Sequence, residues 1–234
     1  MIRAIQFQNK RVGSTFLQNA LNTHTDIVGI DEVFVNVCRK AKYRKSGFIP
    51  FVRPENKFKQ PKNYLNNYIY KQYPDKNTAF KLMYNQIEYH NGLYGYVADG
   101  KKPMIHLMRK NLVKQVISGL TAARTAHNPI SISPDQFFNM VTQVNQENKN
   151  WGRKFKRQIK LVLYYEDIIG ETIGDKTYLS PNANIAICNF FEVEQQQMYS
   201  ITKKKNKEDI SVYLPNYEVI KKRFKGSQFE WMIK

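Results

Sequence analysis

The chain has 234 residues, of which 42% are hydrophobic and 24% charged, as in an ordinary globular protein long enough for one domain with a sizeable core. No stretch approaches ~20 consecutive apolar residues, so no transmembrane helix is expected. The formal net charge of +18 favours anionic partners such as nucleotides, sulfated or phosphorylated acceptors, anionic lipid surfaces or nucleic acid, although a generally basic surface accounts for it equally well.

Residues 1–7 lack the long apolar core of a secretion signal, so we expect the protein to stay in the cytoplasm where it is made. Cys38 and Cys188 are the only cysteines, and both are expected to be reduced thiols in that compartment. The four histidines are scattered without zinc spacing, and no metal site is expected. His106 lies within an apolar run and is expected to be buried with its hydrogen bonds satisfied.

Five short apolar runs, each bounded by polar or helix-type sequence, are predicted to be buried strands, and the third of them is the weakest. In chain order they cover residues 2–6, 27–30, 78–83, 104–108 and 160–165. Apolar residues at helical spacing predict helices at residues 15–22, 111–123, 136–148, 183–191 and 217–224. Strands that alternate with helices predict an α/β protein with a central, mainly parallel sheet, whose ligands bind at the carboxyl ends of the strands.

The chain shows no internal repeat and no linker rich in Gly, Ser or Pro, so residues 1–234 are predicted to form a single domain. Residues 39–62 are dense in Lys, Arg, Pro and aromatic residues and show little periodicity. They predict a basic, partly irregular insertion that extends to about residue 75. A second basic segment, residues 202–207, is predicted to be a loop ahead of the last helix.

The segment after the first predicted strand has the composition of an anion-binding loop. Gly13 allows the backbone to approach an anion, Ser14 and Thr15 add hydroxyl donors, and Lys10 and Arg11 add positive charge. The helix that follows offers unpaired N–H groups and the positive end of its dipole. The Walker A pattern is absent, which disfavours an ATPase or GTPase of that type. Taken alone, the loop is weak evidence for an anion site, because many loops carry Gly-Ser-Thr as a simple helix start.

Residues 11–15, R-V-G-S-T, resemble the R-[SV]-G-[ST]-T loop of sulfotransferases that use 3′-phosphoadenosine 5′-phosphosulfate (PAPS). Further resemblances to this family follow in the family's order and span nearly the whole chain. They are the helix, turn and strand of residues 16–28, the K-L-M-[WY]-x-Q segment at residues 80–86, the strand-end Arg109 with Ser118, the Y-E-D of residues 165–167, and the terminal residues 215–218 with 225–227. The nearest resemblance is to bacterial nodulation-factor and trehalose-type enzymes and to tyrosylprotein sulfotransferases.

The resemblance implies a P-loop-like, three-layer α/β/α sulfotransferase fold with two phosphate sites. Arg109 and Ser118 are expected to clamp the 3′ phosphate, Tyr165 to contact the adenine, and Arg124 either to assist or to be a solvated helix end. The full set of residues expected to bind the donor is Lys10, Arg11, Val12, Gly13, Ser14, Thr15, Phe16, Arg109, Ser118, Tyr165, Thr202, Lys203 and Lys204.

The resemblance also implies catalytic roles for Glu32, Lys81 and Arg11. Glu32 occupies the place of the family's catalytic glutamate and is expected to remove the acceptor's proton; Asp31 or a histidine, His90 being the nearest in sequence, is the alternative base. Lys81 is expected to touch the bridging or sulfuryl oxygens, unless it is a solvated surface lysine. The products would be a sulfate ester and adenosine 3′,5′-bisphosphate, with no metal required.

The acceptor is expected to be a hydroxyl on a glycan, a glycolipid or a small alcohol. The residues between Glu32 and Lys81 match no pattern of the family, so the identity of the acceptor stays open. The basic segment 39–62 follows the candidate base and could line the acceptor site, which would favour an anionic or polyhydroxylated acceptor. Two other functions stay open: an ATP-dependent phosphotransferase on a related scaffold, and a non-enzymatic nucleic-acid-binding protein. The sequence leaves the oligomeric state open.

Overall fold

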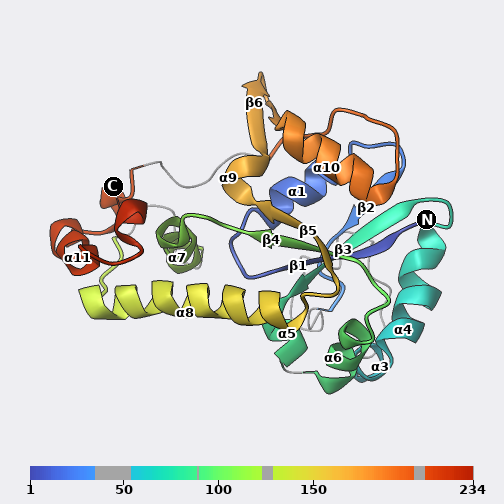
Figure 1. The fold of residues 1–234 in the computed structure, drawn as a ribbon, viewed down its shortest axis with the longest axis horizontal. Helices are drawn as coiled ribbons and strands as arrows, with labels where there is room; N and C mark the ends of the chain where they lie inside the picture. The colour runs from blue at the N-terminus through green and yellow to red at the C-terminus, as the bar shows by residue number, and fades with distance from the viewer. Residues whose placement is uncertain (35–53, 89, 123–128, 203–208, 234) are drawn as a thin grey trace.

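The computed structural model describes residues 1–34, 54–88, 90–122, 129–202 and 209–233. A five-stranded sheet with the order β2-β3-β1-β4-β5 lies at its centre (Figure 1). Its strands are β1 (Arg3–Gln8), β2 (Ile27–Ile30), β3 (Asn77–Met83), β4 (Met104–Met108) and β5 (Ile159–Tyr164). All five predicted strands are therefore confirmed: β2 and β4 have the predicted bounds, and the ends of the other three differ by at most two residues.

All four strand pairings of this sheet are parallel, as predicted. The carboxyl ends of the strands consequently lie along one edge. β1 is the middle strand; the connections from β1 lead first to β2 and β3 on one side, and β4 then pairs on the other side. This reversal of direction makes the carboxyl end of β1 a topological switch point, which is where open α/β sheets bind ligands.

Helices cover both faces of the sheet, which confirms the three-layer α/β/α arrangement (Figure 1). On one face lie α1 (Ser14–Leu21) and α10 (Pro181–Phe191), whose buried Leu17 and Ile187 join Ala4 and Leu107 of the strands in one core cluster. The other face is covered by the helices α3 (Pro54–Lys59), α4 (Pro61–Tyr64), α5 (Tyr84–Glu88), α6 (Asn91–Ala98) and the end of α8 (Pro134–Lys154).

A third core cluster lies beside the sheet and contains no residue of its strands. It combines α7 (Leu112–Thr121), the first half of α8 and α11 (Tyr217–Phe224) with two 3₁₀ turns, Ser211–Tyr213 and Glu230–Ile233. The 21-residue helix α8 connects this cluster to the sheet, because Phe137 is buried in the first and Trp151 in the second. None of the helices in the described ranges is long and apolar enough to cross a membrane.

The sequence did not predict a small antiparallel sheet of β6 (Ile169–Ile173), β7 (Lys176–Leu179) and β8 (Tyr199–Ser200). These strands are short and largely solvent-facing, so they carry no apolar run that periodicity could detect. The described part of the basic insertion is also more regular than expected. α3 and α4 begin at Pro54 and Pro61, and a π-helical turn, Leu65–Ile69, and a 3₁₀ turn, Tyr70–Gln72, follow. Proline suits the first turn of a helix, and this explains both starts.

Candidate active site

The loop between β1 and α1 has the backbone of an anion site. Gly13 is the N-cap residue of α1, with φ 83° and ψ 21°, and as a glycine it has no side chain that could accept from the amides of the first turn. Arg11 also has a left-handed backbone, with φ 64°. Uncapped amides at a helix start attract anions, and positive φ at a non-glycine residue is a strain that clusters at functional sites.

Tyr165 lies directly on this loop. It opens the short helix α9 (Tyr165–Ile168) at the end of β5, and a Cβ atom added to Gly13 would lie 2.0 Å from its Cδ2 atom. Its ring also meets Phe16 edge-on, at 6.4 Å between centroids. The contact leaves no room for a side chain at residue 13. Glycine at this position therefore lets the Tyr165 ring pack directly on the loop.

Arg11 and Ser118, 107 residues apart in the chain, meet above the loop. Arg11 Nε donates to Ser118 Oγ at 3.1 Å, and Gln115, one turn earlier on α7, donates from Nε2 to the Lys10 carbonyl at 2.8 Å. Arg109, which follows β4, donates from Nη1 to the Arg11 carbonyl at 3.5 Å. The structure thus brings Arg11, Arg109 and Ser118 together at the switch point.

Arg109 is held by two residues of the Y-E-D segment. Its side chain is 11% exposed, its Nε lies 3.4 Å from Glu166 Oε1, and its guanidinium lies 5.1 Å from the centroid of the Tyr165 ring. Burial lowers the pKa of Arg109, while Glu166 and Tyr165 oppose that shift. Glu166 also accepts the backbone N–H groups of Lys110 and Asn111, at 2.8 and 3.2 Å.

Glu166 is therefore a site residue that the sequence analysis missed. The Y-E-D motif contained the signal, but only its tyrosine was given a role. The carboxylate orients Arg109 and fixes the start of α7, so it positions both members of the expected 3′-phosphate clamp.

Lys81 and the Asp31-Glu32 pair lie at the neighbouring strand ends. Lys81 is 3% exposed and donates from Nζ to Asp31 Oδ1 at 3.0 Å, so the alternative of a solvated surface lysine is wrong. Glu32 Oε2 accepts from Gln86 Nε2 on α5 at 3.2 Å. Lys57 of α3 donates to the Val33 carbonyl at 3.1 Å and thereby attaches the insertion to the residue after Glu32. Asp31 and Glu32 thus have different partners.

Two buried glutamines lie beneath the loop. Gln6 is opposite Lys81 in the β1–β3 register, and its Nε2 donates to Gln8 Oε1 at 2.8 Å and to the Ser14 carbonyl at 3.4 Å. Both glutamines are completely buried. Gln6 Oε1 has no hydrogen-bond partner among the residues that the structure describes. Polar residues inside an apolar strand were a visible signal that the sequence analysis did not use.

The remaining predicted donor-site residues are placed as follows. Val12 and Phe16 are buried in the core beneath α1, so only their backbone can face a ligand. Thr202 accepts from Asn19 Nδ2 of α1 at 2.7 Å, one turn or more from the start of that helix. Lys203, Lys204 and Arg124 lie outside the described residues.

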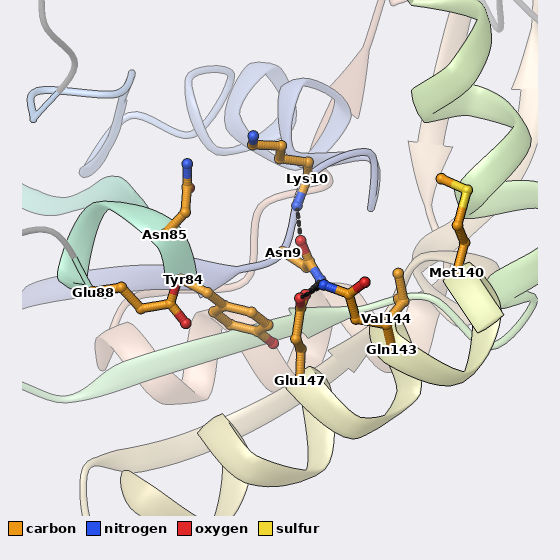
Figure 2. Close-up of a pocket in the computed structure, with 9 residues that line it drawn as sticks. All are labelled: Asn9, Lys10, Tyr84, Asn85, Glu88, Met140, Gln143, Val144 and Glu147. Atoms are coloured by element: carbon orange, nitrogen blue, oxygen red, sulfur yellow. Dashed lines mark hydrogen bonds between the residues drawn. The ribbon is translucent and has the colours of Figure 1, made fainter. Parts of the chain in front are cut away.

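A cleft of about 360 Å³ opens beside the loop (Figure 2). Three segments line it: the loop, α5, and the middle of α8. Their residues are Asn9, Lys10, Tyr84, Asn85, Glu88, Met140, Gln143, Val144 and Glu147. Figure 2 shows Asn9 between Lys10 and Glu147. The Asn9 side chain accepts from the Lys10 backbone N–H and donates to the Glu147 carboxylate.

His106 is 2% exposed, as predicted for a structural histidine. Its Nε2 lies 2.5 Å from the Tyr84 hydroxyl, which donates to Asn148 Oδ1 at 3.2 Å. Burial lowers the pKa of His106 to about 4, so the ring is neutral at pH 7. His90 stacks on Phe58 with 3.5 Å between ring centroids, and burial, then Lys57, lowers its pKa.

Fold and site together define an α/β protein with a strand–loop–helix unit at the switch point of a parallel sheet. No family model and no curated protein matches the chain. Among solved structures, the chain is similar to a sulfotransferase from Alicyclobacillus acidocaldarius, with 13% sequence identity and a TM-score of 0.48 over 96% of this chain and 91% of that one.

Proposed function

We propose that this protein is a sulfotransferase that moves a sulfuryl group from PAPS to an acceptor hydroxyl. The observation that carries the proposal is the meeting of Arg11, Arg109 and Ser118 at one loop. PAPS carries two separate anionic groups, the 5′ phosphosulfate and the 3′ phosphate. Two guanidinium groups on neighbouring segments suit such a donor, because arginine can grip two oxygens of one anion at once.

The residues around Gly13 fit the phosphosulfate end. The uncapped amides of α1, the hydroxyls of Ser14 and Thr15, and the Arg11 side chain would hold it, with the backbone of Val12 and Phe16 adding to the turn. Gly13 lets the Tyr165 ring pack directly on the loop, in the space that a Cβ atom would occupy. Lys10 would add positive charge to the same loop.

The opposite end of the donor would meet Arg109 and Ser118. In this proposal Arg109 shares its charge between Glu166 and the 3′ phosphate, and Tyr165, which contacts both Gly13 and Arg109, contacts the adenine. Thr202, Lys203 and Lys204 would close over the donor from the far side of α1. Only Thr202 of these three lies in the described chain.

In the transfer step the acceptor oxygen forms a bond to sulfur, and the bond from sulfur to the bridging phosphate oxygen breaks. Glu32 would take the acceptor's proton, and Gln86 would hold its carboxylate in place. Lys81 and Arg11 would meet the charge that grows on the leaving oxygen. A positioned base contributes about 10²–10⁴ in rate, and each preorganised charge-stabilising donor about 10²–10³.

The test is transfer of radiolabelled sulfate from PAPS to a panel of glycosides and alcohols, with wild-type protein and Glu32→Gln. The amide keeps the size of the glutamate but cannot take a proton. We expect kcat to fall by about 10²–10⁴ while adenosine 3′,5′-bisphosphate binds as before. Glu171→Gln, on the exposed strand β6, is the matched control and should keep wild-type rates. A larger loss with Asp31→Asn than with Glu32→Gln would assign the base to Asp31 instead.

A thermal-shift comparison separates the competing functions. Sulfotransferase activity predicts stabilisation by adenosine 3′,5′-bisphosphate without added metal, whereas a phosphotransferase predicts stabilisation by ATP with Mg²⁺. Absence of both PAPS binding and sulfuryl transfer to every acceptor would overturn the proposal.

A further inference from the structure

The cleft of about 360 Å³ lies next to both halves of the proposed chemistry. On one wall, Asn9 and Lys10 directly precede Arg11 in the loop. On another wall, Asn85 of α5 is adjacent in sequence to Gln86, which holds the Glu32 carboxylate. A molecule in the cleft would therefore border the segments that carry the proposed donor-binding arginine and the proposed base.

The walls of the cleft offer hydrogen bonds in both directions. Asn9, Asn85 and Gln143 carry amides, which donate and accept, and Glu88 and Glu147 carry carboxylates, which accept from hydroxyls. Met140 and Val144, on the same side of α8, add a small apolar surface (Figure 2). Dense polar groups beside a small apolar patch suit a molecule with many hydroxyls and a hydrocarbon face, which is the chemistry of a sugar ring.

Some of these polar groups are already paired and others are available. Glu147 accepts from Asn9 Nδ2 at 2.8 Å and from Gln143 Nε2 at 2.9 Å, which fixes the α8 wall to the loop. The side chains of Asn85 and Glu88 make no hydrogen bond or ion pair with any residue in the described part of the chain. The α5 wall thus presents an amide and a carboxylate toward a ligand.

The charge of the cleft differs from that of the whole protein. One lysine and two glutamates line it, a formal charge of −1, whereas the chain carries +18. An anionic acceptor would meet the carboxylates of Glu88 and Glu147 and, when PAPS is bound, the negative donor as well. An uncharged acceptor would meet neither repulsion.

From these features we infer that this cleft binds the acceptor and that it selects an uncharged, polyhydroxylated molecule, a neutral sugar or glycoside, over an anionic one. The assignment as an acceptor site rests on the proposed function. The basic residues 39–62 led us to expect an anionic or a polyhydroxylated acceptor. The walls of the cleft that the structure describes do not favour an anion, so of these two only the polyhydroxylated acceptor remains.

Two probes that differ at one carbon test this selectivity. p-Nitrophenyl β-glucoside carries a hydroxymethyl group where p-nitrophenyl β-glucuronide carries a carboxylate. Their dissociation constants are measured by ligand-observed NMR, without donor, at about 150 mM salt so that long-range attraction is screened. We expect the glucoside to bind about fivefold more tightly or better.

Variants then locate the selectivity. Glu88→Lys should shift the ratio of the two dissociation constants by about fivefold toward the glucuronide. Glu171→Lys makes the same change of charge on β6 and should leave the ratio unchanged. Val144→Trp should fill the cleft and abolish glucoside binding, whereas Thr142→Trp, placed about half a turn away on the outer side of α8, should not. Asn85→Trp blocks the opposite wall if Val144→Trp does not fold.

Several outcomes would overturn the inference: equal or tighter binding of the glucuronide by wild-type protein, no binding of either probe, or glucoside binding that survives in both folded blocking variants. Because these measurements use no donor, they are independent of the sulfate-transfer assay. If that assay fails while the glucoside still binds in the cleft, the proposed function falls and the neutral-sugar site stands.

Discussion

At the scale of single residues, Gly13 and Tyr165 control the geometry of the loop. Gly13 combines a left-handed backbone, φ 83°, with an aromatic ring where its side chain would be. The ring of Tyr165 in turn contacts both the loop and the Arg109 guanidinium. A side chain at residue 13 would therefore meet two obstacles, the left-handed backbone and the Tyr165 ring. Removing one of these obstacles would leave the other.

Gly13→Ala tests this pair. The added Cβ would lie 2.0 Å from the Tyr165 ring, which must move, and the left-handed backbone costs alanine a further ~1–2 kcal/mol. We expect a lower free energy of unfolding in urea and at least about tenfold weaker binding of adenosine 3′,5′-bisphosphate, given that 1.4 kcal/mol corresponds to a factor of ten. Gly95→Ala is the matched control, because nothing lies within 4 Å of its Cβ position in α6. Unchanged binding by Gly13→Ala would remove the loop from the site.

His106 gives stability a dependence on pH. Its pKa is about 4 in the folded protein, against 6.5 for a free histidine, so the unfolded chain binds more protons between these values. The stabilisation is fully present above pH 6.5 and is lost as the pH falls toward 4, by roughly 3 kcal/mol in total.

In His106→Gln this dependence should be reduced. Urea unfolding near pH 7 and near pH 4.5 should show wild-type protein losing roughly 2–3 kcal/mol more than the variant over that interval. The amide can still hydrogen-bond to the Tyr84 hydroxyl, which limits the loss of packing. Equal pH dependence in the two proteins would mean that His106 titrates normally.

At the scale of secondary structure, α8 connects the helical cluster to the sheet and supplies one wall of the cleft. A capping box begins it: Ser133 Oγ accepts from the Gln136 N–H at 3.2 Å, and Gln136 Oε1 accepts from the Ser133 N–H at 3.3 Å. Only the middle of α8 was predicted from periodicity. Its ends depend on this cap and on Trp151, which packs against the far side of the sheet.

Ser133→Ala should lower the free energy of unfolding by about 1 kcal/mol, because the variant leaves an amide of the first turn unpaired. Urea unfolding measures the change, with the exposed Ser131→Ala as the control for loss of a serine hydroxyl. A cost equal to that of Ser131→Ala would show that the cap contributes nothing.

At the scale of the whole molecule, the charge of +18 attracts any anion, whereas the proposed donor site binds one kind. Raising the salt concentration from about 50 mM to 200 mM should weaken sequence-independent binding of single-stranded DNA by ~10² or more, because many counterions are released. Binding of adenosine 3′,5′-bisphosphate, which involves few contacts, should weaken far less. Fluorescence anisotropy at several salt concentrations measures both, and tight binding of DNA at high salt would favour the nucleic-acid-binding alternative.

The sequence by itself determined the parallel α/β class and the position of the loop. Both follow from local patterns: short apolar runs form strands, alternation with helices makes them parallel, and a Gly-Ser-Thr turn between strand and helix leaves amides free. The buried environment of His106 could be predicted on the same ground, because its neighbours in the strand are apolar. In the sequence, Glu166 and Gln6 could be recognised only as polar residues, and neither had an evident role.

Tertiary structure alone decided which side chains meet. Arg11 and Ser118 are 107 residues apart and come together because the order β2-β3-β1-β4-β5 places β4 and its helix beside β1. The arrangement of the elements in space also pairs Lys81 with Asp31 and not with Glu32. It likewise forms the cleft from three segments that are separate in the sequence. Periodicity indicates which face of an element is buried, but it carries no information about which distant element covers that face.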